Sequence, residues 1–116
     1  MALSYVNKPN DMYVITYLES HGSCDIYIDY STRAIIYTMG NNAQVVGHYI
    51  LQATSSTYGG NVTVTPLTSA SSLTLTGQTL NLHIESTSSY QTSIYCIYLG
   101  SATPNNPPRK QIVVTP

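Results

Sequence analysis

The chain has 116 residues, of which 8% are charged and 42% hydrophobic, and its formal net charge is -1. This length suits one domain with an apolar core, and the composition is not that of a disordered chain. Only four Lys and Arg residues are present, too few to bind a run of phosphates, so the sequence predicts neither nucleic-acid binding nor attachment to a membrane surface.

We expect no signal peptide, because the first residues show no basic start followed by an apolar stretch. No apolar run approaches the roughly 20 residues of a membrane helix. We therefore expect a chain that is cytoplasmic or is released without a signal peptide. An excised domain of a longer protein remains an alternative.

The pattern along the chain predicts about eight strands and no helix. Tyr occurs 11 times and Phe and Trp are absent, and Tyr, Thr and Ser alternate with aliphatics in short runs. Gly, Asn and Ser separate these runs. The predicted strands are 12–18, 24–30, 33–38, 44–53, 61–65, 72–76, 79–85 and 92–99. Residues 1–100 are thus expected to form one all-β domain, an antiparallel β-sandwich of jelly-roll type.

Two of these strands, 12–18 and 92–99, are apolar on both faces. Strands such as 79–85 instead have one apolar face, with Leu80, Leu82 and Ile84 directed inward. Either loops and solvated tyrosine hydroxyls cover the second apolar face, or it is a subunit interface. We favour the interface, and hence a homo-oligomer, because monomers rarely expose large apolar patches. The candidate interface residues on these two strands are Tyr13, Ile15, Tyr17, Tyr95, Ile97 and Leu99.

The C-terminal segment has two parts. Residues 101–110 form a polar, Pro-rich connector, and residues 111–116 have strong strand propensity. This last strand either packs on its own sheet or pairs with a neighbouring subunit, which adds Ile112 and Val114 to the candidate interface.

The two cysteines, Cys24 and Cys96, both lie in apolar runs. Buried free thiols are the favoured interpretation, and a disulfide between them is the alternative. Their wide separation is superficially like that of the immunoglobulin cysteine pair. However, the chain has no Trp, and Tyr95 is adjacent to the second cysteine rather than two residues before it, so we do not assign that family.

No catalytic or metal-binding pattern is present in the sequence. There is no nucleophile elbow, and His21, His48 and His83 lie in unrelated settings. Asp25 and Asp29 would stand roughly 13 Å apart on one strand, too far for a glycosidase pair. The sequence lacks zinc motifs, calcium loops and phosphate loops, so we expect neither an enzyme nor a cofactor.

Binding and assembly remain as functions. Our first hypothesis is a non-enzymatic structural protein of a virion surface, such as a bacteriophage capsid decoration, minor capsid or fibre-tip protein, with itself and other virion proteins as partners. The alternative is a small lectin-like domain, because Tyr, Ser, Thr and Asn suit glycans. The candidate ligand-facing loop residues are Asn41, Asn42, Tyr58, Asn61 and Tyr90.

Overall fold

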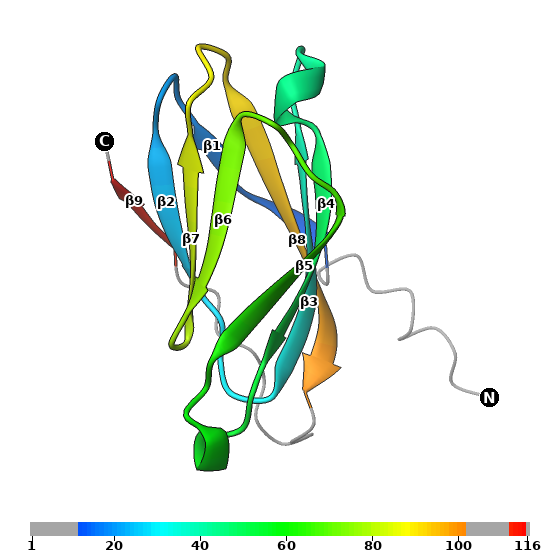
Figure 1. Ribbon diagram of the computed structural model, residues 1–116, viewed down its shortest axis with the longest axis vertical. Helices are drawn as coiled ribbons and strands as arrows, with labels where there is room; N and C mark the ends of the chain where they lie inside the picture. The colour runs from blue at the N-terminus through cyan, green and yellow to red at the C-terminus, as the bar shows by residue number, and fades with distance from the viewer. Residues whose placement is uncertain (1–11, 102–111, 116) are drawn as a thin grey trace, which may run out of the picture.

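The computed structural model describes residues 12–101 and 112–115. Within them, two antiparallel sheets pack face to face (Figure 1). The strands are β1 (Met12–Leu18), β2 (Ser23–Tyr27), β3 (Thr32–Met39), β4 (Gly47–Ala53), β5 (Val62–Thr68), β6 (Leu73–Gln78), β7 (Asn81–Ser86), β8 (Thr92–Ser101) and β9 (Ile112–Thr115). The predicted all-β sandwich is confirmed.

The strand order is β1-β8-β3-β4-β5 in one sheet and β6-β7-β2-β9 in the other. Hairpins join β3, β4 and β5, and another joins β6 to β7, whereas the remaining connections cross between the sheets. Loops therefore gather at two ends of the sandwich (Figure 1). We call these the upper end (loops 19–22, 40–46, 69–72 and 87–91) and the lower end (loops 28–31, 54–61 and 79–80).

The core lies between the sheets and is made by alternate residues of each strand. On β7, Leu82 and Ile84 are fully buried, as their spacing predicted, and Val62 and Leu73 are also buried. Leu80, predicted to point inward with them, instead precedes β7 with a positive φ of 52° and is only half-buried. Full burial of one such side chain stabilises the fold by about 1.5–3 kcal/mol. This shared core positions the loops at both ends.

Within two predicted strands, 44–53 and 24–30, local hydrogen bonds turn the chain. The predicted strand 44–53 begins only at Gly47, since residues Ala43–Val45 form a 3-10 helix, η3. The Asn42 side chain caps it by accepting a hydrogen bond from the Gln44 backbone N–H (2.8 Å). The predicted strand 24–30 ends at Tyr27, and Asp29 Oδ1 then accepts a hydrogen bond from the Tyr30 N–H (2.8 Å).

Both cysteines are buried thiols that are not joined by a disulfide, with Cys24 on β2 in one sheet and Cys96 on β8 in the other. Burial raises the pKa of Cys24 to about 12, with a smaller contribution from the Asp25 charge. This thiol therefore serves as a small apolar core group.

The last strand pairs within its own chain. β9 runs antiparallel to β2, with Val114 opposite Cys24 and Ile112 opposite Ile26. The connector predicted over 101–110 lies outside the described residues except for Ser101, where β8 ends. Across the described part of the chain, no helix has the length and apolar character needed to cross a bilayer.

Candidate functional site

The outer face of the five-stranded sheet is apolar over most of its length. Its side chains alternate with the buried residues of β3, β4 and β8, so they point away from the core. We call this surface the outer apolar face. It consists of Tyr17, Met39, Tyr37, His48, Tyr95, Ile35, Ile50 and Ile97.

The face is organised in rows across the strands. At the upper border, Tyr17 is 59% exposed and Met39 is 49% exposed. The next row holds three rings. Tyr37 and Tyr95 stack with centroids 5.0 Å apart, and Tyr37 lies 5.9 Å from His48. Such stacked pairs add about 0.5–1.5 kcal/mol beyond area burial, so the rings of this row hold one another in place.

The third row is aliphatic. Ile35 on β3 lies directly opposite Ile50 on β4 and Ile97 on β8, and all three side chains are half-buried. The register continues below them with Arg33 opposite Gln52, where the apolar surface gives way to polar groups. The outer apolar face thus ends at the lower end of the sandwich.

The structure places the predicted interface residues in different parts of the fold. Tyr17, Tyr95 and Ile97 lie on the outer apolar face, and Leu99 is exposed near the lower end of β8. Tyr13 and Tyr17 do not hold equivalent positions. A register shift between Val14 and Thr16 sets Tyr13 opposite buried Cys96 and Tyr17 opposite Ser93. Simple alternation along this strand, which grouped Tyr13, Ile15 and Tyr17, therefore fails at the bulge.

The C-terminal candidates lie away from this face. Ile112 and Val114 occupy β9 at the edge of the four-stranded sheet, at register positions opposite core residues of β2. They belong to the edge strand of the other sheet and do not extend the outer apolar face.

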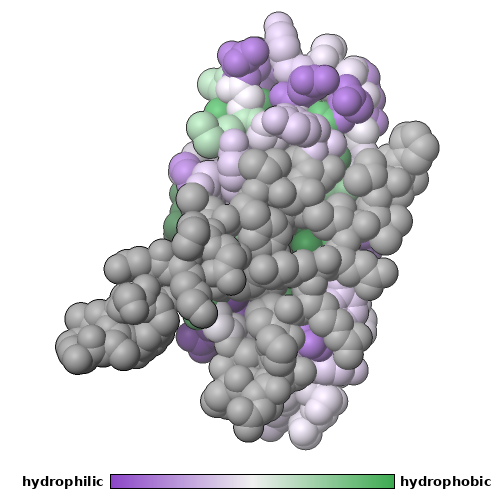
Figure 2. All heavy atoms as spheres, turned by 180° about the vertical axis from the view of Figure 1, so that it is seen from behind, coloured by the Kyte–Doolittle hydropathy of each residue, from purple (hydrophilic) through white to green (hydrophobic). Residues whose placement is uncertain are grey.

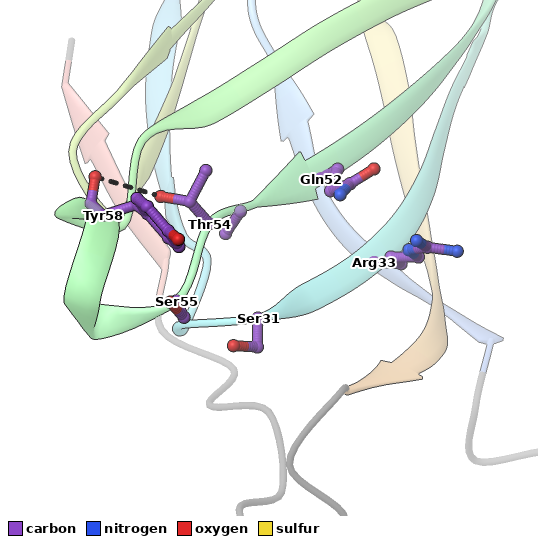
Figure 3. Close-up of a pocket in the computed structure, with 7 residues that line it drawn as sticks. Ser31, Arg33, Gln52, Thr54, Ser55 and Tyr58 are labelled. Carbon is purple, nitrogen blue, oxygen red and sulfur yellow. Dashed lines mark hydrogen bonds between the residues drawn. The ribbon is translucent and has the colours of Figure 1, made fainter.

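The lower end contains a hollow of about 290 Å³, which we call the lower pocket. The start of β3, the end of β4 and the β4–β5 loop form its wall (Figure 3). Its lining residues are Ser31, Arg33, Gln52, Ala53, Thr54, Ser55 and Tyr58. The wall thus combines one cation, one amide, hydroxyls and one aromatic ring.

Hydrogen bonds fix the loops around the lower pocket. The Ser31 N–H donates to the Thr54 carbonyl oxygen (3.0 Å), which ties the β2–β3 turn to the β4–β5 loop. Thr54 Oγ1 accepts from the Asn61 N–H (2.9 Å) and donates to the Tyr58 carbonyl oxygen (3.4 Å). Ser31 itself has a positive φ of 59°, an unfavourable conformation for a non-glycine residue that these neighbours hold in place.

Gly60 closes the same loop. Its φ is +70°, and a Cβ at this position would lie 2.6 Å from a methyl carbon of Leu80 and 2.8 Å from the Tyr30 ring. The loop therefore needs glycine here for both its conformation and its close packing. Tyr58, 73% exposed, is presented on this fixed loop.

The predicted ligand-facing residues do not form one site. Tyr58 and Asn61 are at the lower end, and only Tyr58 lines the pocket, while the Asn61 side chain donates to the Tyr58 carbonyl oxygen (3.4 Å). Asn41, Asn42 and Tyr90 are at the upper end, which is largely hydrophilic in the view from behind (Figure 2). Sequence reasoning missed Arg33 and Gln52, because only the strand register brings them together.

The outer face of the four-stranded sheet carries a polar ladder. His83 Nδ1 lies 2.8 Å from Asp25 Oδ1, and His83 Nε2 lies 3.2 Å from Glu85 Oε1. The hydrogen bonds to Asp25 and then to Glu85 raise the pKa of His83. The hydrogen bond from Asn81 (2.9 Å), followed by that from His83, lowers the pKa of Asp25. This arrangement links strands β2 and β7.

Among the described residues, no group of three His, Cys, Asp or Glu side chains is placed to hold a metal ion. Comparison with known proteins adds no assignment, since no family model, curated protein or solved structure matches the chain. Two surfaces remain as candidates, the outer apolar face and the lower pocket.

Proposed function

We propose that this protein is a non-enzymatic assembly protein that associates with a second copy of itself through the outer apolar face. The observation that carries the proposal is the row of stacked rings beside a row of three isoleucines, on the side of the sheet directed away from the core. Aromatic and aliphatic side chains without charge are typical of the centre of protein interfaces.

The chemistry of the face favours a second copy as the partner. None of its eight side chains carries a carboxylate, an amine or a guanidinium. In a two-fold dimer this face packs against the same face of the second copy. Two neutral faces can make this contact without charge repulsion. A charged partner would find no oppositely charged group among these eight side chains. The Arg33 guanidinium lies beyond them, on the lower border of the face.

The size of the face sets the strength of the association. Four strands about 4.8 Å apart and seven residues of about 3.4 Å give a projected area of roughly 450 Å² per copy. The total of about 900 Å² lies below the roughly 1,200–2,000 Å² of stable specific interfaces and within the range of weak, transient ones. We therefore expect a reversible oligomer whose population depends on concentration.

The setting we propose is a virion surface, with the chain acting as a bacteriophage capsid decoration, minor capsid or fibre-tip protein. A small all-β domain with 8% charged residues and a hydroxyl-rich exterior suits packing at high local density, where few charges mean little mutual repulsion. Genes for capsid, portal or tail proteins beside its own gene would support this setting. A neighbourhood of metabolic genes would count against it.

Charge insertion on each sheet tests the assembly surface. We expect Ile35→Lys, at the centre of the outer apolar face, to abolish association in sedimentation velocity. Thr74 is exposed on β6 of the other sheet, so Thr74→Lys is the matched control and should leave the association intact. Equal loss in both variants, or in neither, would contradict the proposed interface.

A second candidate function is carbohydrate binding at the lower pocket. The specific observation in its favour is that exposed Tyr58 lines one hollow together with the Gln52 amide and serine hydroxyls. Sugar rings stack on aromatic faces, and their hydroxyls bond to such groups. Titration of the whole chain with a panel of monosaccharides, followed by NMR, tests this function. The absence of chemical-shift changes near Tyr58 at high sugar concentration would refute carbohydrate binding at this pocket.

A further inference from the structure

We propose that the lower pocket binds an acidic sugar, a pyranose ring that bears one carboxylate. Arg33 would bind the carboxylate, and Tyr58 would stack on the ring. The inference rests on the second candidate function and adds the class of ligand.

Arg33 is the first support. It is the only Lys or Arg within residues 12–101 and 112–115, and no ion pair of this described part involves it. Its side chain is exposed and lines the pocket beside Gln52, its register partner on β4 (Figure 3). A guanidinium can bind a carboxylate through two parallel hydrogen bonds, and such charge-assisted bonds are about twice as strong as neutral ones. The one Lys or Arg side chain of the described residues thus borders an open hollow that has no carboxylate among its described lining residues.

The charge balance favours a carboxylate over a phosphate. A carboxylate carries one negative charge, which one guanidinium neutralises. A phosphate monoester carries about -1.5 to -2 near neutral pH and would keep unneutralised charge. Among the described lining residues, no second Lys or Arg compensates it.

The rest of the wall suits a sugar ring. Tyr58 offers an exposed aromatic face on the β4–β5 loop, while Ser31 and Ser55 supply hydroxyls around the same hollow. The volume of about 290 Å³ is just below the roughly 300–1,000 Å³ of drug-sized ligand pockets, which fits one ring better than an oligosaccharide.

The wall is also preorganised. The turn at Ser31 is tied to Thr54, and Thr54 is tied to Asn61 and Tyr58, so both loops keep their positions without a ligand. Binding then orders few groups, and this reduces its entropic cost. The positive φ of Ser31 at the pocket rim is consistent with a strained residue kept at a binding site.

Glucuronate and glucose form the matched ligand pair for the test, because they differ only in the carboxylate at C6. We expect NMR titration of the whole chain to give a glucuronate Kd at least tenfold below that of glucose, equivalent to about 1.4 kcal/mol. The Arg33→Gln variant should lose this preference, and Tyr58→Ala should weaken both ligands. Tyr90→Ala, at the opposite end, is the control and should change neither.

Each other outcome overturns the inference in a distinguishable way. Equal binding of both sugars would refute the acidic ligand and leave carbohydrate binding standing. Binding of neither sugar would refute both the acidic ligand and carbohydrate binding at this pocket. Acetate binding as tightly as glucuronate would assign a plain carboxylate site, such as one for an acidic peptide, and would refute the sugar.

Discussion

Removal of one exposed aromatic side chain gives the sharpest quantitative test of assembly. Tyr17 lies on the upper border of the outer apolar face and is 59% exposed in the single chain. A tyrosine buries about 150–250 Å² in all, so roughly 100 Å² remains for a partner to cover. At about 25 cal/mol per Å², this area is worth at most ~2.5 kcal/mol per copy.

Only part of this gain appears as affinity, since binding also orders the side chain. If about 1 kcal/mol per copy is realised, the two copies in a two-fold dimer contribute about 2 kcal/mol. We therefore expect Tyr17→Ser to raise the dimer Kd about 30-fold. Sedimentation equilibrium over a concentration series measures this change, with circular dichroism to verify that the fold is retained.

Tyr90→Ser is the matched control, because Tyr90 is 51% exposed but lies in the β7–β8 loop at the upper end. Its Kd should stay within about twofold of the original. An unchanged Kd for Tyr17→Ser, or an equal rise for Tyr90→Ser, would refute the reasoning that places the contact on the outer apolar face.

Four further predictions concern stability and reactivity. The pKa of His83 is raised above its ordinary 6.5, so its pairing stabilises the fold fully below that pH and is lost as pH rises through the folded value. Urea unfolding should show about 0.5–1 kcal/mol less stability at pH 8.5 than at pH 5.5, and His83→Gln should remove the difference. The pKa of Asp25 is lowered below 3.8, so its contribution is lost as pH falls through the folded value, and Asp25→Asn should flatten the acid limb of the same profile. Gly60→Ala should cost about 1–3 kcal/mol in thermal unfolding, because its φ is positive and its Cβ site is occupied. The buried Cys24 thiol should react with iodoacetamide only as fast as the fold opens, and denaturant should accelerate its alkylation steeply.

Other outcomes would contradict these predictions separately. A pH profile that His83→Gln leaves unchanged would show that the polar ladder contributes nothing measurable. A Gly60→Ala variant as stable as the original chain would mean that the loop adapts without strain. Fast alkylation of Cys24 in native buffer would show that β2 is not closed against the core.

The fold class was readable from the sequence because side-chain alternation is a local property. Leu82 and Ile84 are buried on β7 while His83 and Glu85 lie on the opposite face, as period-two spacing predicted. The pattern was lost where side chains hydrogen-bond to the backbone. Asn42 caps a 3-10 turn over Ala43–Val45, so the predicted strand 44–53 begins only at Gly47.

Properties that depend on strand order were not readable. The pairing of Arg33 with Gln52 follows from the register of the β3–β4 hairpin, and that of Asp25 with His83 follows from the pairing of two strands distant in sequence. The bulge between Val14 and Thr16 changes which side of the sheet each following residue faces, and alternation alone cannot reveal one inserted residue. For the same reason, Asn42 and Tyr58 looked equivalent as loop residues although they lie at opposite ends of the sandwich.

The central claim is that the outer apolar face binds a second copy of the chain. Light scattering of the whole protein across a thousandfold range of concentration tests it most directly. We predict a mass that rises from the 12.6 kDa of one chain toward a multiple of it as concentration increases. A mass that stays at one chain throughout would contradict the account.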